Sequence, residues 1–352
     1  MSKLVNYIQI VPPHAATGLV AAVYAEMRHD LRAVAEPISL HSPLPELLAG
    51  AWSILRETLI AGTVRRGIKE AVAATVADLN GCPWCVDVHR LMLRVTGEGD
   101  AADALLRRRL EEVKDSRVRE VMVWAAATRT PAAAILQRPP FSPEEAPEMI
   151  GTAVTFHYLT RMVNALLVET PLPRSHLARA VIGRIAPWLR GALVNDAAVP
   201  RSLLGHLTET ELPADLRWPS MAPAVAGAFA QFAATVEHVG ERVVPPAVRE
   251  FVLDQITHWT GDDPGPSRHW GTEAIAALDR EDQASARLAL LAALAAYQID
   301  AAVVDAFRRQ QPSDDALVGT LAWASFTTAR RIGTWLGEPR PNPPGSWTTA
   351  TG

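Results

Sequence analysis

The sequence predicts an all-α protein that contains a duplicated helical module, whose second copy is degenerate. Alanine and leucine dominate, and apolar residues recur mostly at spacings of three and four, which is typical of amphipathic helices. Aromatic and β-branched residues are sparse between the turn signals. Because 49% of the 352 residues are hydrophobic, the chain can bury a substantial core and is long enough for two domains.

Helical patterns follow one another along the first half, separated by Pro, Gly and Ser. The predicted helices cover residues 17–35, 45–62, 64–80, 83–96, 115–129, 143–169 and 174–193. Ser142 before Pro143 and two glutamates is a signal for a helix start. The polar, Pro-containing stretch from Asn195 to Met221 is typical of a linker.

An internal repeat relates the two sides of this linker. At a constant offset of 180 residues, Glu70 aligns with Glu250, Gly81 with Gly261, and His89 with His269. At an offset of 168, the sequence GTAVTFHYLT from Gly151 aligns with GTLAWASFTT from Gly319, so twelve residues are inserted in the first half. The second copy has Asp262 and Gly265 where the first has cysteines. We therefore expect the second copy to be catalytically silent.

These signals divide the chain into four parts. We expect a catalytic helical domain over residues 1–195, a linker over 196–221, a degenerate helical domain over 222–336, and an extended or disordered tail over 337–352. Glu250 and His269 are expected to remain as a pair that hydrogen-bond each other.

The charge pattern limits the possible partners. The net charge of -4 comes from 34 basic and 38 acidic residues that are scattered along the chain, so we expect no nucleic-acid and no membrane partner. The N-terminus is a poor secretory signal, because Pro12 and Pro13 interrupt its short apolar run. The apolar run from Leu288 to Ala296 is too short to span a bilayer. These features predict a cytoplasmic protein.

The chain has two cysteines, Cys82 and Cys85, in a CxxC motif. In a reducing compartment such a pair is typical of redox chemistry or metal binding. Gly81 is expected to end one helix, and Pro83 suits the first position of the next. A helix start favours a thiolate, and a spacing of three places both sulfur atoms on one face, close enough to form a disulfide.

Two further residues complete a candidate proton relay. His89 lies four residues after Cys85, one turn further along the same helix face, so Cys85 is the favoured nucleophile. Glu70 lies on the preceding helix. If the two helices pair antiparallel, Glu70 reaches the depth of His89, where a carboxylate can hold the imidazole tautomer and raise its basicity.

The spacing E-x11-CxxC-x3-H resembles that of AhpD-like alkylhydroperoxidases within the carboxymuconolactone decarboxylase family. The segments RETLIAGTVRRGIKE and FHYLTRMVNALL add to the resemblance, which covers roughly residues 40–170 and reaches the second half through its degenerate copy. It implies an all-helical fold, hydroperoxide reduction by a CxxC dithiol, and trimeric or higher assemblies. Residue by residue, it implies that Cys85 is the peroxidatic thiol, Cys82 the resolving thiol, and His89 with Glu70 the proton relay.

Trp84 departs from this pattern, because some family members have a histidine immediately before the peroxidatic cysteine. Trp84 either lines a substrate pocket or shields the dithiol. His157 is expected to be a core or interface residue. Arg161, four residues later on the same helix face, is expected to form a structural salt bridge rather than to anchor the carboxylate of a substrate.

The predicted function is a thiol-dependent peroxidase that needs no cofactor and no metal. Its expected partners are a small hydroperoxide substrate, a dithiol or protein reductant, and further copies of the chain, with a trimer favoured. Alternatives are a decarboxylase-type lyase, against which the two cysteines argue, and a non-catalytic redox sensor. A structural zinc site is disfavoured, because the sequence has no second CxxC and no HxxxH to complete four ligands.

Overall fold

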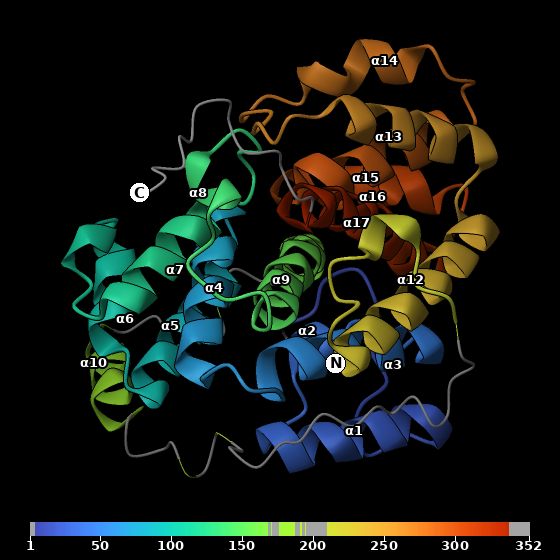
Figure 1. Cartoon of the computed structure of the whole chain (residues 1–352). Helices are drawn as coiled ribbons and strands as arrows, with labels where there is room; N and C mark the ends of the chain where they lie inside the picture. Colours follow the sequence, from blue (N-terminus) through green and yellow to red (C-terminus); the bar gives the residue numbers. More distant parts are fainter. Residues whose placement is uncertain are drawn as a thin grey trace, which may run out of the picture.

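The computed structural model describes residues 4–167, 170, 176–186, 191, 194 and 210–337 (Figure 1). Within these residues the regular structure is helical, and the only β contact is an isolated bridge between Val5 and Leu167. The predicted all-α class is therefore confirmed. No helix in this part of the chain is both long and apolar enough to cross a membrane.

The first half follows the helical pattern of the sequence closely. Its elements are α1 (Gly18–Leu31), α2 (Glu36–Ser39), α3 (Pro45–Leu55), the π-helix η1 (Arg56–Ile60), α4 (Arg66–Leu79), α5 (Pro83–Thr96), α6 (Gly99–Arg107), η2 (Leu110–Glu112), α7 (Ser116–Ala126), α8 (Ala134–Gln137), α9 (Ala146–Leu166) and α10 (His176–Ile185). The prediction for 83–96 matches α5. The helix predicted from residue 143 begins later, at Ala146, because residues 143–145 form a turn.

The second half contains η5 (Ala214–Leu216), α12 (Pro223–Val243), α13 (Pro246–His258), η6 (His269–Gly271), α14 (Thr272–Ala276), α15 (Gln283–Leu294), η7 (Ala296–Gln298), α16 (Ala301–Arg308) and α17 (Asp314–Gly337). Most of the predicted linker, up to residue 209, and the predicted tail from 338 onward lie outside the described residues.

Helix positions in the second half follow the two sequence offsets. Helix α13 begins at Pro246, 180 residues after Arg66 at the start of α4, and α17 begins at Asp314, 168 residues after Ala146 at the start of α9. Helices α12, α15 and α16 likewise fall close to the shifted positions of α3, α7 and α8. These coincidences support the proposed duplication.

Two aligned glycines make comparable close contacts. A Cβ on Gly151 of α9 would lie 2.5 Å from the side chain of Thr58 in η1. A Cβ on Gly319 of α17 would lie 2.7 Å from the side chain of Val239 in α12, one residue beyond the position that the offset of 180 assigns to Thr58. A glycine therefore lets α9 approach η1 closely in the first half and lets α17 approach α12 closely in the second, which also supports a duplicated module.

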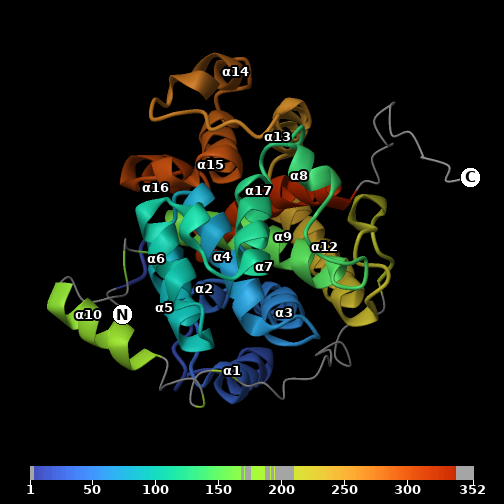
Figure 2. The same cartoon turned by 60° about the vertical axis from the view of Figure 1, so that its left-hand side comes forward.

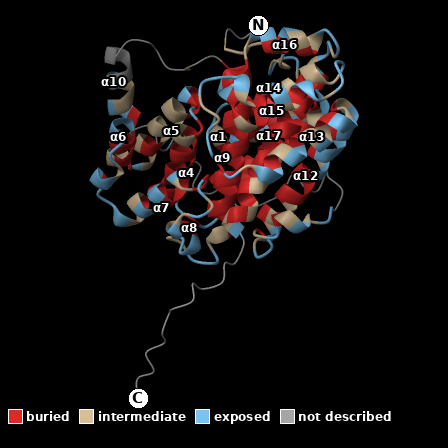
Figure 3. Ribbon diagram, turned by 90° about the horizontal axis from the view of Figure 1, so that it is seen from above, coloured by how far each residue is buried: buried red, intermediate tan, exposed pale blue. Residues whose placement is uncertain are grey.

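Corresponding helices of the two halves pack against each other, α9 against α17 and α3 against α12. Helices α4 to α7 gather on one side of α9, and α13 to α16 on the other (Figure 1 and Figure 2). Figure 3 shows that buried residues concentrate in α4, α9 and α17. Helices α9 and α17 therefore form the centre of the core, and α9 packs against both α4 and α5.

Guanidinium groups of the first half bind backbone carbonyls of the second. Arg161 Nε donates to the Ala293 carbonyl at 2.8 Å, and Arg129 Nε donates to the Gly261 carbonyl at 3.0 Å. Within the described residues no carboxylate forms an ion pair with Arg161, so the predicted salt bridge is wrong. Burial, together with the charge of Arg129, lowers the pKa of Arg161 to about 9.

His157 is fully buried in α9, and its ring is hydrogen-bonded to Thr128 and Asn80. The predicted core role of His157 is therefore confirmed. Its hydrogen bond to Asn80 also ties α9 to the turn that precedes the two cysteines.

The region around Glu250 and His269 differs from its counterpart in the first half. Both residues are exposed, and no hydrogen bond joins them in the described structure, so the predicted relic pair is wrong. The physical reason is local. Residues 259–268, which include Pro264 and Pro266, form no helix, so His269 is not carried on a helix packed along α13 as His89 is carried on α5.

Candidate active site

The CxxC motif occupies the start of α5. Gly81 has φ +57°, a left-handed conformation that favours glycine, and it allows the sharp turn from α4 into α5. Cys82 is the N-cap of α5, and its Sγ accepts a hydrogen bond from the backbone N–H of Cys85 at 3.4 Å. Both thiols are free and buried, with their Sγ atoms 2.6 Å apart. The predicted proximity of the two sulfur atoms is confirmed.

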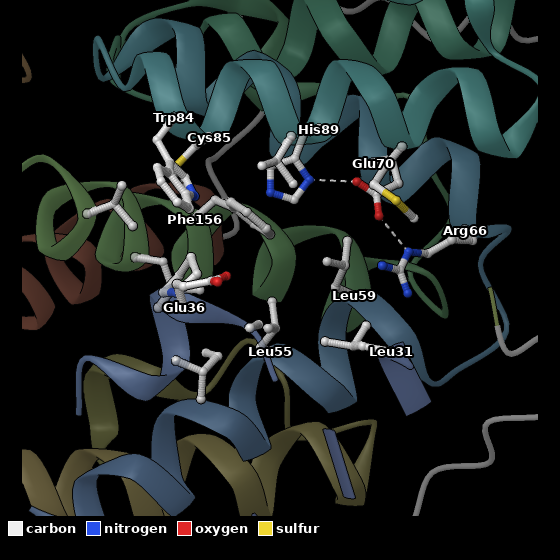
Figure 4. A pocket seen from close by; sticks show the side chains of 17 residues that line it. Leu31, Glu36, Leu55, Leu59, Arg66, Glu70, Trp84, Cys85, His89 and Phe156 are labelled. Atoms are coloured by element: carbon white, nitrogen blue, oxygen red, sulfur yellow. Dashed lines mark hydrogen bonds and ion pairs between the residues drawn. The ribbon is translucent and has the colours of Figure 1, made fainter. Parts of the chain in front are cut away.

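A cavity of about 260 Å³ lies against α5 (Figure 4). Its walls come from the end of α1, α2, α3, η1, α4, α5 and α9. Its lining residues are Leu31, Ala35, Glu36, Pro37, Ile38, Leu55, Leu59, Arg66, Glu70, Trp84, Cys85, Val88, His89, Met92, Phe156, Leu159 and Val163. Cys85 therefore faces the cavity, whereas Cys82 does not line it.

Three of the four candidate residues line this cavity together. Figure 4 shows His89 between Cys85 and Glu70, which is the order that the helix geometry predicts. The Nδ1 atom of His89 lies 2.6 Å from Oε2 of Glu70, so the predicted contact between these residues is confirmed. Within the described structure no hydrogen bond joins His89 to Cys85; the two share the cavity wall.

Glu70 is a fully buried carboxylate with two basic partners. In addition to His89, Arg66 donates from Nε to Oε1 of Glu70 at 2.7 Å. Burial alone would raise the pKa of Glu70, but the charges and hydrogen bonds of Arg66 and His89 outweigh burial and lower the pKa to about 2. Glu70 is therefore ionised at neutral pH and acts as a fixed hydrogen-bond acceptor.

This carboxylate determines the tautomer of His89. An ionised carboxylate only accepts hydrogen bonds, so Nδ1 of His89 must carry a proton and donate it to Glu70. In the neutral ring, Nε2 is then left as the proton acceptor. The imidazole and the Phe156 ring pack in a T-shaped arrangement, with ring centroids 4.6 Å apart and planes at 89°, which further fixes the orientation of His89.

The acidity of Cys85 differs from the expectation. Burial is the largest effect that raises the pKa of the Cys85 thiol well above its ordinary value, and neighbouring Cys82 raises it further. The predicted preference for a thiolate at the helix start is therefore wrong for the resting site, because desolvation outweighs the helix terminus. A base must remove the proton from Cys85 before it can react as a nucleophile.

Several residues of the cavity carry little or no signal in the sequence. Arg66 lies four residues before Glu70 on α4, a spacing that could have indicated an ion pair. Glu36 and Phe156 reach the cavity only through tertiary packing. Trp84, for which two roles were considered, lines the cavity.

The described residues contain no cluster of three or more His, Cys, Asp or Glu side chains arranged to hold a metal ion. Of the polar groups at the cavity, Glu70, His89 and Arg66 are engaged with one another. The arrangement suits proton transfer to and from a sulfur atom that faces an apolar space.

The chain is similar over nearly its whole length to a protein of Mycobacterium tuberculosis (strain ATCC 25618 / H37Rv) described as alkyl hydroperoxide reductase Rv2159c. The two sequences are 41% identical over 335 residues, which cover 95% of this chain and 96% of that protein. No protein-family model matches the chain, and no solved structure matches it. This level of identity, over both halves, shows that the chain belongs to the family of AhpD-like alkylhydroperoxidases.

Proposed function

We propose that the chain is a thiol-dependent peroxidase that reduces hydroperoxides through a cycle of Cys82 and Cys85. One observation carries this proposal: of two thiols 2.6 Å apart, Cys85 faces an apolar cavity whose wall also holds the His89 and Glu70 pair. The similarity to a protein described as an alkyl hydroperoxide reductase supports the same activity.

The first step is oxidation of Cys85. Nε2 of His89 accepts the thiol proton, while Glu70 stabilises the resulting imidazolium. The Cys85 thiolate attacks the outer oxygen of the hydroperoxide, and an S–O bond forms as the O–O bond breaks. The alkoxide leaves as an alcohol after it takes a proton from His89. Cys85 is oxidised to a sulfenic acid, and the peroxide is reduced.

The second step uses Cys82, whose Sγ lies 2.6 Å from that of Cys85 and which does not line the cavity. Its sulfur attacks the sulfenic acid, an S–S bond forms, and the hydroxyl leaves as water with the Cys82 proton. A dithiol donor then reduces the disulfide in two thiol–disulfide exchanges and becomes a disulfide itself. This cycle uses Cys85 as the peroxidatic thiol and Cys82 as the resolving thiol.

The shape and chemistry of the cavity support an alkyl or aryl hydroperoxide as the substrate. Apart from Cys85, its polar residues are Glu36, Arg66, Glu70 and His89, and aliphatic or aromatic side chains form the rest of the wall. An apolar tail of the substrate gains free energy by leaving water for such a surface.

A peroxide-consumption assay tests the proposal. Purified protein with cumene hydroperoxide and excess dithiothreitol is expected to consume many equivalents of peroxide per chain. The double variant Cys82→Ser with Cys85→Ser is expected to consume no more than the buffer. Equal consumption by the two proteins would rule out the dithiol cycle. The trimeric assembly implied by the family resemblance stays a prediction, which light scattering can test.

A further inference from the structure

Glu36 is a carboxylate at the cavity that the proposed cycle does not use. It is the first residue of α2, and Figure 4 shows its side chain directed into the cavity, on the wall across from α5. Its backbone carbonyl accepts a hydrogen bond from Ser39, but no hydrogen bond or ion pair holds its carboxylate within the described residues. Its place at the start of α2 therefore does not explain why its carboxylate points into the cavity.

This side chain determines the sign of the permanent charge on the cavity wall. Arg66 and Glu70 form a hydrogen-bonded ion pair and neutralise each other. His89 adds a positive charge only while it is protonated. The remaining lining residues, apart from Cys85, are apolar. With His89 neutral, Glu36 makes the cavity negative.

Glu36 also borders two cavities. It lines the cavity of Cys85 and a second cavity of about 520 Å³, which is formed largely by the segment from Val5 to His14. A substrate tail that extends from the thiol toward the second cavity would pass the carboxylate. The position of Glu36 therefore suits discrimination by charge at the tail of the substrate, away from the reacting oxygen atoms.

We propose that Glu36 is a specificity-determining residue that makes the enzyme select neutral over anionic hydroperoxides. The inference rests on the proposed peroxidase function. A carboxylated substrate brings a second negative charge into an apolar space where Arg66 is already paired, and like charges repel each other. A neutral ester of the same substrate keeps its size and avoids the repulsion.

The test compares para-carboxycumene hydroperoxide with its methyl ester, using kcat/KM for each. In the wild type the ester is expected to be preferred by about tenfold because of this repulsion. In Glu36→Gln the preference is expected to fall to about twofold, and Glu36→Asp should restore it. Because each ratio comes from one preparation, differences in the amount of folded enzyme cancel.

Glu46→Gln is the matched control, since Glu46 lies in the first turn of α3, is exposed, and does not line the cavity. It should keep the wild-type ratio. A wild type that consumes both hydroperoxides equally well, or a Glu36→Gln variant with an unchanged ratio, would overturn the role of Glu36. A wild type that consumes neither would instead contradict the peroxidase function itself.

Discussion

The Glu70 carboxylate and the His89 imidazole are joined by a 2.6 Å hydrogen bond that links helices α4 and α5. The two residues meet because the turn at Gly81 returns the chain along α4. The second oxygen of Glu70 is held by Arg66, so the carboxylate has little freedom to move. This relationship gives His89 a defined tautomer in which Nε2 is the proton acceptor of the neutral ring.

Replacing Glu70 by glutamine should impair catalysis. An amide can donate as well as accept, so it no longer requires Nδ1 of His89 to carry the proton, and it does not stabilise an imidazolium. We expect kcat/KM for cumene hydroperoxide to fall by about 10²-fold or more. Glu98→Gln is a suitable control, because Glu98 is also a buried acid but pairs with Arg65 outside the cavity. Wild-type kinetics in Glu70→Gln would argue against the relay.

The same residue should contribute to stability in a pH-dependent way. Its pKa is lowered in the folded protein from 4.5 to about 2, so its contribution is present above about pH 4.5 and is lost as the pH falls toward 2. The contribution is roughly 3 kcal/mol. Urea unfolding of the wild type and Glu70→Gln should therefore show a stability difference that shrinks between pH 5 and pH 3. A difference that is constant over this range would contradict the buried ionised state.

The two cysteines should behave differently when replaced one at a time. Cys85→Ser is expected to abolish peroxide turnover, because Cys85 alone of the two faces the cavity. Cys82→Ser should undergo one oxidation per chain, with a sulfenic acid at Cys85 that a dimedone adduct and mass spectrometry can detect. An adduct at Cys82 in the Cys85→Ser variant, formed at the same rate, would reverse the assignment.

Local sequence signals were sufficient for much of the fold and for part of the site. Gly81 and Pro83 define the start of α5, and the spacing of Cys82, Cys85 and His89 depends only on helix periodicity. Glu70 could be placed beside His89 because the short turn between α4 and α5 makes these two helices antiparallel neighbours. Each of these inferences involves residues close together in the chain.

Features that depend on distant packing were not predictable in this way. Glu36 reaches the cavity because α2 packs against α9, and the sequence around it carries no signal of that contact. Arg161 was expected to pair with an acid, but it binds the backbone carbonyls of His157 and of Ala293, which lies 132 residues away. The raised pKa of Cys85 also depends on burial by several helices, which outweighs the local effect of its helix start.

The second half of the chain should be structurally necessary although it lacks the cysteines. Tyr158 of α9 is fully buried, and its ring packs edge to face against Phe232 of α12 and Phe326 of α17, with centroids 5.0 and 5.9 Å away. A chain that ends at residue 209 loses both rings and exposes this face of α9 to water. At about 25 cal/mol per Å² of apolar surface, such exposure costs several kcal/mol for each large side chain.

We therefore expect the fragment 1–209 to aggregate or to bind a hydrophobic dye strongly, whereas a chain that ends at residue 337 keeps both halves and serves as the control. Phe326→Ala in the full chain offers a milder test, since it should lower the free energy of unfolding by about 3–5 kcal/mol without touching the cavity. Light scattering and urea unfolding measure the two effects. A monodisperse, fully active 1–209 fragment would show that the first half folds without its partner, and the second half would then need another explanation.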